Sequence, residues 1–344
     1  MAGPKTTGIG IVGMGFMGTT HLEAARRLRG ARVRAIMTSD PRKARGDFRA
    51  VGGNFGSGLG KISLAGIRVH PDLDSLLADP AVDLVDLCLP THCHRDASIQ
   101  ALRYDKHVLV EKPIAVTLPD ATRMLRAAER AGRLLLVAQV LKFFPEFAFL
   151  SEAIRSRRWG KLLRLHTRRV ISKPNWEAGS WLSSRAKSGG MVIDLHIHDT
   201  DFVTYLFGKP KAVTSQGVVR KGQVDFVHTK YHYDRDVPLI TTEGGWINGP
   251  SLPFEHGFEA FFEKASCYYN STHAPAPVCY EQRKAKEIRP KKLDAFRAEL
   301  QAAVDAVHSG KVPPTLSPET AKLSLKVCLA EERSAIKGRR CVVS

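Results

Sequence analysis

Long apolar runs and cysteine motifs are both missing from this sequence. No run approaches the ~18–20 consecutive apolar residues that a membrane-spanning helix needs, and the mean hydropathy is −0.18, so a membrane protein is not expected. The first residues contain no apolar stretch followed by a small-residue cleavage site, so no signal peptide is predicted. The six cysteines form no Cys-x-x-Cys pair, and a chain of 344 residues needs no disulfide to fold. We therefore expect all six cysteines to be reduced, in a cytoplasmic protein.

Acidic residues are scarce relative to basic ones. The chain has 52 Lys and Arg against 34 Asp and Glu, a formal charge of +18. Such an excess makes nucleic acids, anionic surfaces and anionic ligands candidate partners. The charge is spread along the chain, however, and its densest runs, 155–158 and 283–292, carry no zinc-finger, helix-turn-helix or RNA-recognition signature. We expect a solvated basic surface that would also suit a phosphate-rich cofactor, with neither a nucleic-acid nor a membrane partner.

The first 140 residues alternate short β-branched runs with amphipathic stretches. The candidate strands are 9–12, 33–37, 84–89, 107–110 and 134–138. The candidate helices are 17–28, 73–77, 96–104 and 118–131. Because the strands are apolar throughout and alternate with helices, the pattern predicts a parallel sheet covered on both faces.

The pattern changes after residue 143. We expect a helix at 147–157, strands at 162–171, 212–220 and 226–233, and closing helices at 293–307 and 317–334. Segment 238–281 is rich in Gly, Pro and aromatic residues, so its strands are expected to be irregular. The chain should therefore form two domains, a dinucleotide-binding domain at 1–140 and a substrate and oligomerisation domain at 141–344. The last helix is a candidate to pack back on the first domain.

Two overlapping Gly-x-Gly-x-x-Gly matches occur between residues 8 and 18. The register that starts at residue 8 would put glycines inside the first strand, whereas Gly13, Gly15 and Gly18 follow that strand and open a helix. Only this second register fits the dinucleotide fingerprint, in which the glycines make the tight turn, admit the pyrophosphate and allow close helix–strand packing. The amides around Phe16 and Met17 should then face the phosphates at the positive end of the helix.

The end of the second strand indicates which dinucleotide is favoured. An NAD site carries a carboxylate about 20 residues beyond the loop, where it binds the ribose 2′-hydroxyl. That count reaches Thr38 and Ser39, and Arg42 and Lys43 follow in the next helix. Small hydroxyls beside cations suit a 2′-phosphate, so we expect NADP to be preferred. NAD remains the alternative cofactor, because a small shift of register would bring the Asp40 carboxylate to the ribose.

Stretches along nearly the whole chain resemble one family: residue 139 with 143–145, the C-terminal segments 293–310 and 317–338, and four motifs. The four motifs are Gly-x-Gly-x-x-Gly-x-x-His at 13–21, Leu-Pro-Thr-His-Cys-His at 89–94, Glu-Lys-Pro at 111–113, and a segment at 189–201 that contains Asp-x-x-x-His. The Glu-Lys-Pro and Asp-x-x-x-His elements are specific in combination. Together they resemble the glucose–fructose oxidoreductase, inositol dehydrogenase and rhizopine catabolism (Gfo/Idh/MocA) family of nicotinamide-dependent oxidoreductases.

This resemblance implies an α/β protein in two parts. An N-terminal Rossmann domain with a doubly wound parallel sheet would precede an α+β domain with a large, open, mostly antiparallel sheet. That sheet is commonly used for oligomerisation, so a homodimer or homotetramer is expected. The resemblance also implies a cis Lys112–Pro113 bond. The neutral Thr38 and a glycine-rich insertion at 52–60 depart from the family pattern, and we expect the insertion to be a flexible surface loop, with a lid near the cofactor as the alternative.

The same resemblance carries a catalytic set over to Lys112, Asp194 and His198. The residues expected to hold the cofactor combine the glycine loop, the end of the second strand and the two motifs that follow: Gly13, Gly15, Phe16, Met17, Gly18, Thr38, Ser39, Arg42, Lys43, Pro90, His94, Glu111, Lys112 and Pro113. Within this set, Glu111 should support the nicotinamide side or its loop. No metal site is expected, because the acids and histidines of 194–201 lack His-Glu-x-x-His spacing.

The residue types also fit hydride transfer on their own chemistry. Oxidation of a carbinol requires removal of the hydroxyl proton, and histidine, here His198, is the residue type that suits this task near neutral pH. If 191–205 is helical, Asp194 lies on the same face and could orient the imidazole. Lys112 should stand at the carboxyl end of a strand, where its ammonium would stabilise an alkoxide-like transition state.

We therefore expect an NAD(P)-dependent oxidoreductase that acts on a sugar, inositol or related polyol hydroxyl, or on the matching ketone. A non-catalytic NADP(H)-binding redox sensor is the alternative, although a pure sensor need not keep Lys112, Asp194 and His198. A basic nucleic-acid-binding protein is a third reading, suggested by the charge alone. His196 should be structural, and Trp181 could form a substrate wall or pack against the sheet.

Overall fold

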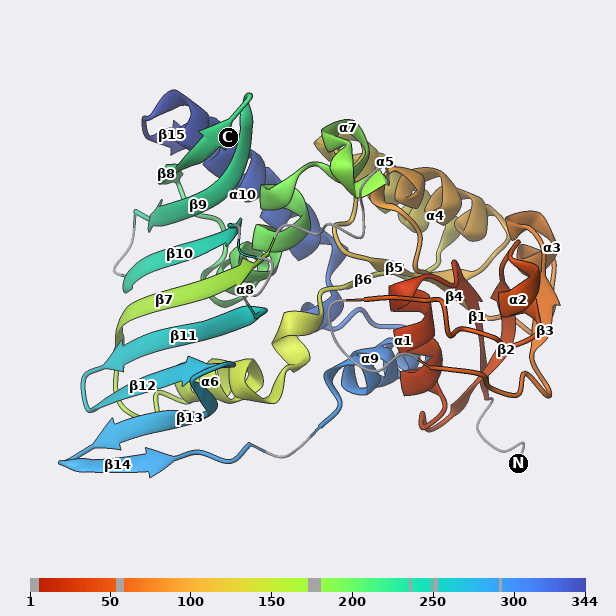
Figure 1. Cartoon of the computed structure of the whole chain (residues 1–344), viewed down its shortest axis with the longest axis horizontal. Helices are drawn as coiled ribbons and strands as arrows, with labels where there is room; N and C mark the ends of the chain where they lie inside the picture. Colours follow the sequence, from red (N-terminus) through yellow and green to blue (C-terminus); the bar gives the residue numbers. More distant parts are fainter. Residues whose placement is uncertain are drawn as a thin grey trace. The chain divides into compact units, whose positions relative to one another are not determined.

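The computed structural model describes residues 6–53, 59–172, 181–234, 237–247, 249, 253–290 and 293–344. The chain forms two compact units (Figure 1). The first combines Met1–Val140 with Asp294–Ala321, and the second combines Leu141–Leu293 with Lys322–Ser344. Residues 54–58 of the glycine-rich insertion lie outside the described residues, so its interpretation as a loop or a lid stays a prediction.

The first unit is built on a six-stranded sheet whose neighbouring strands are all parallel. Its order is β3-β2-β1-β4-β5-β6, the doubly wound arrangement with its reversal between β1 and β4. The strands are β1 (Thr7–Val12), β2 (Ala31–Met37), β3 (Arg68–His70), β4 (Leu84–Leu87), β5 (His107–Glu111) and β6 (Leu135–Ala138). The helices are α1 (Phe16–Ala25), α2 (Pro41–Ala44), α3 (Leu73–Leu77), α4 (His94–Arg103), α5 (Leu118–Ala131) and α9 (Ala295–Ser309). The predicted Rossmann sheet is confirmed.

Local signals in the sequence explain these elements. Every residue of β1, β4 and β6 is buried, as strands covered on both faces require. Helix α5 begins after Thr117, whose hydroxyl accepts a hydrogen bond from the Asp120 N–H, and ends at Gly132 in the left-handed region. Helix α9 comes from the far end of the chain and packs against α1.

The second unit is built on a nine-stranded sheet with the order β14-β13-β12-β11-β7-β10-β9-β8-β15. The β7–β10 pair is parallel and the other neighbouring pairs are antiparallel. The strands are β7 (Leu162–Ile171), β8 (Ala212–Arg220), β9 (Gln223–His232), β10 (Leu239–Trp246), β11 (Glu255–Phe262), β12 (Ala265–Asn270), β13 (Ala274–Glu281), β14 (Lys284–Glu287) and β15 (Cys341–Val342). This mostly antiparallel sheet was expected from the resemblance and is confirmed.

Helices cover one face of this sheet (Figure 1). They are α6 (Pro145–Arg155), α8 (Ile197–Phe207) and α10 (Pro318–Lys337), and a π-helical turn, Val192–His196, leads into α8. The short helix α7 (Arg185–Ser188) also belongs to the second unit. The core unites Phe147 of α6 and Phe202 of α8 with Leu165 of β7 and Val327 of α10. None of the described helices is both long and apolar enough to cross a membrane.

The opposite face of the sheet is left uncovered by these helices. Along β7 the burial alternates, so Leu165 and Thr167 are buried while His166 and Arg168 are partly exposed. We call this outward side of β8–β13, with β7 at its centre, the open face. The sheet therefore has the half-covered character typical of antiparallel sheets.

Segment 238–281 contains the expected strands, but the expectation that all cysteines are reduced is wrong. The segment forms the strands β10, β11, β12 and β13, and the pairing register shifts in β11 between Phe261 and Phe262 and in β12 between Tyr268 and Asn270. Its glycines permit close approach of strands instead of breaking them, since a Cβ on Gly257 would lie 2.2 Å from the Tyr269 carbonyl oxygen. Cys267 and Cys279 are directly opposed on β12 and β13, with Cα atoms 4.2 Å apart, and form a disulfide rather than two reduced thiols.

Candidate active site

The glycine loop joins β1 to α1 at the carboxyl edge of the parallel sheet. Gly13 adopts a φ of +91°, and a Cβ there would lie 2.6 Å from the Cys88 carbonyl oxygen. A Cβ on Gly18 would lie 2.0 Å from the Gly13 carbonyl oxygen, so helix and strand approach closely only without a side chain. A Cβ on Gly15 would meet no described atom within 4 Å. The loop therefore combines two packing glycines with one that faces open space, as the fingerprint requires for a pyrophosphate.

The first turn of α1 suits an anion. Gly15 is the N-cap residue, and the described turn that begins at Phe16 and Met17 contains no acidic side chain. Backbone N–H groups and the positive end of the helix dipole therefore meet at this point. The alternative glycine register is excluded, because residues 8 and 10 lie within β1. The loop and the helix end together fit the phosphates of a dinucleotide.

The corner after β2 carries both an acid and cations. The Thr38 hydroxyl accepts a hydrogen bond from the Asp40 N–H at 3.2 Å. Asp40 caps α2 by accepting a hydrogen bond from the Arg42 N–H at 2.8 Å, and this contact lowers the pKa of its carboxyl group. The Asp40 carboxylate also lies 3.4 Å from the Arg42 guanidinium. Ser39 and Arg42 are exposed and Lys43 is partly exposed, so this corner fits either a ribose hydroxyl or a phosphate.

The Glu-Lys-Pro motif stands where β5 ends. Glu111 is the last residue of β5 and is buried, and the partly exposed Lys112 follows it directly. The Lys112–Pro113 bond is cis, as the resemblance implies. The Glu111 carboxylate accepts a hydrogen bond from the Lys112 N–H at 3.0 Å. Lys112 is thus held at the carboxyl edge of the sheet, where open α/β sheets bind their ligands.

His94 connects the loops that follow β4 and β5. Its Nδ1 lies 2.8 Å from the Pro113 carbonyl oxygen, and its Nε2 lies 2.8 Å from that of Leu89. Burial lowers the pKa of this imidazole. Pro90 precedes the 3-10 turn Thr91–Cys93, from which His94 opens α4. His94 therefore organises the two loops, and direct contact of His94 or Pro90 with a cofactor stays a prediction.

A buried cluster beneath these loops was missed by the sequence analysis. The His21 imidazole on α1 lies between two carboxylates, with Nδ1 2.9 Å from Asp86 Oδ2 and Nε2 3.2 Å from Glu111 Oε1. Cys88 Sγ is 3.5 Å from His21 Nδ1. The ligand atoms of His21, Asp86 and Cys88 lie within 4.8 Å of one another, a spacing that could hold a metal, but the imidazole–carboxylate contact pairs these groups directly. The available signal was Asp86 itself, a charge inside an otherwise apolar strand.

The Asp-x-x-x-His motif of the second unit does not form a plain α-helix. Residues Val192–His196 make a π-helical turn and α8 begins at Ile197, so the four-residue spacing expected for one α-helical face is interrupted. Even so, every residue of the fully described stretch 191–204 is buried except Asp194 and His198. Both side chains therefore reach the accessible side of this helix. π-helical turns of this kind are frequent at functional sites.

A buried polar network holds the π-helical turn against the sheet. His196 Nε2 lies 3.0 Å from the Thr242 hydroxyl oxygen, which is 3.0 Å from the Tyr231 hydroxyl. Tyr231 donates a hydrogen bond to the Glu331 carboxylate at 2.6 Å. A Cβ on Gly244 would lie 2.7 Å from His196 Nδ1, so β10 leaves room for this ring. His196 thus has the structural role expected of it.

Two further acids of the motif anchor α8. Arg169 donates a hydrogen bond to Asp199 at 2.6 Å, and Lys142 donates one to Asp201 at 2.6 Å. Ser324 on α10 donates to the other oxygen of Asp201 at 2.9 Å. All of these side chains are buried. Removing one partner of such a pair leaves an uncompensated charge, so these acids fix α8 rather than take part in chemistry.

Each part of the expected catalytic set is thus placed within its own unit. Lys112 lies in the first unit, and Asp194 and His198 lie in the second, so their joint action is a proposal. Trp181 begins the 3-10 turn Trp181–Ser183 and is partly exposed, and its role as a substrate wall stays a prediction.

Known proteins share both halves of the chain. Residues 7–139 match the oxidoreductase family with an NAD-binding Rossmann fold, and residues 147–266 match the GFO/IDH/MocA C-terminal domain. Myo-inositol 2-dehydrogenase of Thermotoga maritima is 25% identical over 348 residues, covering 96% of this chain and 97% of that protein. scyllo-Inositol 2-dehydrogenase (NADP(+)) of Bacillus subtilis is 27% identical over 269 residues, covering 75% and 69%.

The fold is shared with solved structures at lower identity. Levoglucosan dehydrogenase in complex with NADH superposes with a TM-score of 0.84 at 19% identity, covering 98% of this chain and 99% of that one. The sheet order, the glycine loop and the match of two successive family domains agree with one another. The chain belongs to the Gfo/Idh/MocA family of oxidoreductases, whose N-terminal domain is an NAD-binding Rossmann fold.

Proposed function

We propose that this protein is an NAD(P)-dependent dehydrogenase or reductase that interconverts a hydroxyl of a sugar, inositol or related polyol with the matching ketone. The observation that carries this proposal is the partial exposure of Asp194 and His198 in a stretch whose other residues are buried, which leaves an acid and an imidazole accessible together. The inositol dehydrogenases among the relatives support the substrate class.

Three residues of this chain, together with a bound cofactor, would carry out the reaction. A bound nicotinamide would accept or donate the hydride. His198 takes the hydroxyl proton during oxidation and returns it during reduction, since an imidazole titrates near neutral pH. The Lys112 ammonium donates a hydrogen bond to the reacting oxygen and stabilises its developing negative charge. Asp194 orients the imidazole or binds a neighbouring substrate hydroxyl.

NADP is the proposed preferred cofactor. Thr38 and Ser39 place hydroxyls rather than a carboxylate directly after β2, and the cations Arg42 and Lys43 stand one turn further on. Asp40 would favour NAD if its carboxylate bound the ribose. That carboxylate, however, already caps α2 and pairs with Arg42. One relative is named for NADP(+), and a structural neighbour contains NADH.

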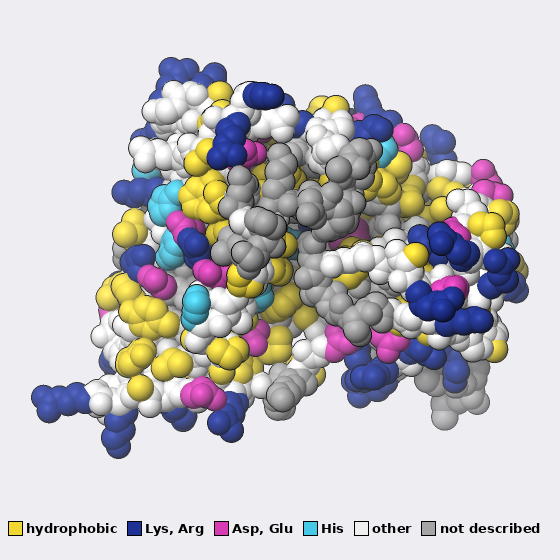
Figure 2. Space-filling model, in the orientation of Figure 1, with side chains coloured by type: hydrophobic (Ala, Val, Ile, Leu, Met, Phe, Trp, Pro, Cys, Tyr) yellow, Lys and Arg dark blue, Asp and Glu magenta, His cyan; other side chains and the backbone are white. Residues whose placement is uncertain are grey.

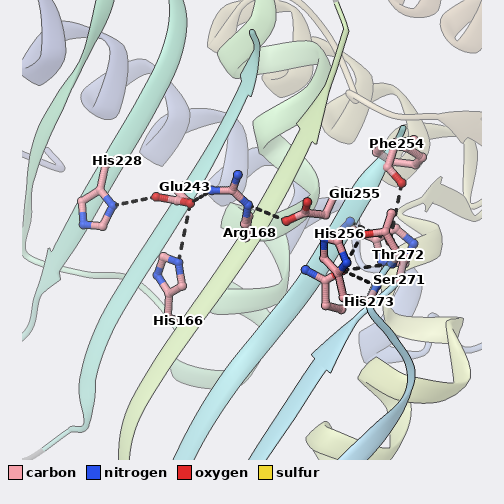
Figure 3. Close-up of polar contacts among 11 residues, drawn as sticks. His166, Arg168, His228, Glu243, Phe254, Glu255, His256, Ser271, Thr272 and His273 are labelled. Carbon is pink, nitrogen blue, oxygen red and sulfur yellow. Dashed lines mark hydrogen bonds and ion pairs between the residues drawn. The ribbon is translucent and has the colours of Figure 1, made fainter. Parts of the chain in front are cut away.

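A homodimer or homotetramer that covers the open face is also proposed. Figure 2 shows apolar, acidic, basic and histidine side chains mixed over this side of the sheet. Figure 3 shows its central ladder, in which Arg168 of β7 pairs with Glu243 of β10 and Glu255 of β11, while His228 of β9 faces Glu243. Toward β13, the exposed side chains of Tyr268 on β12 and Tyr280 on β13 add apolar area. Mixed apolar and polar character of this kind is typical of protein interfaces.

The first test measures cofactor binding and turnover together. The purified protein is titrated with NADPH and with NADH by tryptophan fluorescence, and inositols and sugars are then screened with the oxidised form that binds. Tight binding of NADPH and turnover of a polyol are expected. Binding without turnover of any polyol favours the redox sensor, and binding of neither dinucleotide contradicts the oxidoreductase.

The catalytic assignment has its own test in the Lys112→Met variant. Turnover should fall on the order of 10²–10⁴-fold with an unchanged melting temperature, because the ammonium is needed in the transition state rather than for folding. Lys211→Met, which alters an exposed lysine paired with Asp234, is the matched control and should keep full activity. Near-normal turnover by Lys112→Met would disprove the role of this lysine.

A further inference from the structure

His21 has no part in the chemistry proposed above, yet it is fully buried between two acids. Its two ring nitrogens face acceptors on opposite sides, Asp86 at 2.9 Å and Glu111 at 3.2 Å. An ionised carboxylate only accepts hydrogen bonds, and an imidazole donates from both nitrogens only when it is protonated. The two flanking carboxylates therefore favour an imidazolium at this position, which is hydrogen-bonded through Nδ1 to Asp86 of β4 and faces Glu111 of β5 as a close charge contact.

The surroundings of the ring agree with this charge. Burial alone would lower the pKa of His21, but the Asp86 carboxylate outweighs it and raises this pKa well above the usual value. The groups that face the ring are Asp86 and Cys88 from the β4 side, Glu111 from β5 and the Phe296 ring of α9. Burial and Asp86 raise the pKa of the Cys88 thiol, so Cys88 is neutral. The net charge of the cluster is then one negative charge, adjacent to the Lys112 ammonium.

The cluster reaches Lys112 through Glu111. One Glu111 oxygen contacts His21, and the other accepts a hydrogen bond from the Lys112 N–H at 3.0 Å. Burial would raise the pKa of Glu111, but His21 and the charge of Lys112 outweigh burial and lower this pKa. These two cations therefore keep the Glu111 carboxylate ionised. The Cys88 carbonyl at the other end of the cluster packs against Gly13. A single imidazolium thus connects the glycine loop with the segment that carries Lys112.

We propose that His21 is a positioning residue that, as an imidazolium, ties Asp86 to Glu111 and so fixes Lys112 for the reaction. A role in stability alone is the rival explanation. Against it stands the cost of burying three ionisable groups, since well-packed apolar side chains would serve stability as well or better. The proposal rests on the function proposed above, because only that function gives Lys112 a catalytic role for which its position matters.

The first experiment measures the charge of His21 without any substrate. Nitrogen NMR of the labelled full-length protein should show the His21 ring as an imidazolium through neutral pH and above. In Asp86→Asn the main anionic partner is removed and burial prevails, so the ring should be neutral at about pH 8. A neutral His21 in the wild-type protein at neutral pH would overturn the proposal.

The second experiment measures the pH dependence of kcat/KM for polyol oxidation. In Asp86→Asn the alkaline limb should move toward neutral pH by about one unit or more, because loss of the His21 proton now occurs within the working range. A purely structural role would lower stability and leave this limb in place. An unmoved limb in a folded Asp86→Asn protein whose His21 has become neutral therefore overturns the proposal.

His21→Gln provides a second variant in case Asp86→Asn does not fold. It should lower kcat on the order of 10–10²-fold while the Kd of the dinucleotide stays nearly unchanged, as expected for a misplaced catalytic group. The matched control is His107→Gln, which alters the histidine at the other end of β5, where Nδ1 accepts a hydrogen bond from the Leu134 N–H. Equal losses of kcat in both variants would contradict a specific link to Lys112.

Failure of the proposed function can be told apart from failure of this inference. If no polyol is turned over, the Lys112 ammonium is followed instead by reductive ¹³C-methylation, with its resonance assigned from Lys112→Arg. In Asp86→Asn that resonance should shift as His21 titrates. A Lys112 signal that is indifferent to the charge of His21 overturns the inference, whereas a coupled signal supports it even when the substrate class is wrong.

Discussion

At the corner after β2, the side chains of Asp40 and Arg42 carry opposite charges 3.4 Å apart. If the guanidinium binds a 2′-phosphate, Arg42→Ala should raise the Kd for NADPH about tenfold, because a charge-assisted hydrogen bond contributes roughly 1.5–3 kcal/mol. The Kd for NADH should hardly change. Arg45→Ala, which removes an exposed cation one turn further on, is the control, and equal weakening of both dinucleotides by Arg42→Ala would argue against a phosphate contact.

Glu243 on the open face gives a residue-scale prediction for pH. Its hydrogen bond with His228 and the nearby Arg168 lower the pKa of Glu243 to about 2, although burial opposes this shift. A carboxyl group whose folded-state pKa lies below its unfolded value of ~4.3 adds stability above that value and loses it as the pH falls toward the folded-state pKa. Glu243→Gln should therefore cost about 1–3 kcal/mol at neutral pH and progressively less below about pH 4.

Denaturant unfolding of wild type and Glu243→Gln across this pH range measures the difference. Glu259→Gln is the control on the same face, where a more exposed carboxylate pairs with Arg164 and the expected cost is at most ~1 kcal/mol. A difference between wild type and Glu243→Gln that stays constant from neutral to acid pH would show that the ion pairs of Glu243 do not carry the effect.

The role of a single residue could be predicted where its spacing from neighbouring motif residues indicated that role. The register Gly13–Gly15–Gly18 follows from its place between a strand and a helix, and the structure confirms that place. Glu331 could not be found in this way, and Asp86 offered only the signal of a charge inside an apolar strand. Each becomes meaningful only through a partner far away in the chain, such as Tyr231 or His21, and no local pattern encodes those contacts.

At the scale of elements, the glycine loop predicts different outcomes when alanine replaces glycine at two of its positions. Gly18→Ala would place a Cβ 2.0 Å from the Gly13 carbonyl oxygen and should lower stability by about 1–3 kcal/mol, as overpacking does. Gly15→Ala meets open space and should leave the melting temperature nearly unchanged while weakening dinucleotide binding. Thermal unfolding and fluorescence titration of both variants separate the two effects, and unchanged cofactor affinity in Gly15→Ala would refute the assigned path of the pyrophosphate.

Elements with clear periodicity and end signals were predicted at their boundaries. The expected bounds of α3, α5, β7 and β8 coincide with those in the structure. Between β10 and β13 the composition indicated irregular strands, and the pairing register does shift there, but it did not show that glycines such as Gly257 serve close strand packing. The π-helical turn at Val192–His196 was not predictable from spacing either, since its geometry depends on the buried contact between His196 and Thr242.

At the scale of the whole molecule, the boundary near residue 140 followed from the change in sequence pattern. The continuous second domain 141–344 is wrong, because Asp294–Ala321 with α9 belongs to the first unit, whereas most of the last helix, α10, which was the candidate to pack back, stays in the second. Helix α9 has an ordinary amphipathic pattern, and its partner α1 lies at the other end of the chain. The charge of +18 likewise indicated candidate partners without locating a surface. Sequence patterns report which face of an element is buried, but not which distant element buries it.

The assembly of the molecule gives the last prediction. On the open face, Tyr268 and Tyr280 are 36% and 52% exposed, and their rings meet edge to face at 5.8 Å next to Phe261. If a second copy covers this face, Tyr280→Glu should bury a charge in the interface and raise the dissociation constant by roughly tenfold or more. Analytical ultracentrifugation across a concentration series measures this shift. Tyr104→Glu, at a comparably exposed tyrosine that follows the last residue of α4 in the first unit, should leave assembly intact. Since the open face belongs to the second unit and Glu111–Lys112 to the first, a monomeric Tyr280→Glu protein should still bind the dinucleotide. Loss of binding together with assembly would instead mean that the cofactor site depends on the partner subunit.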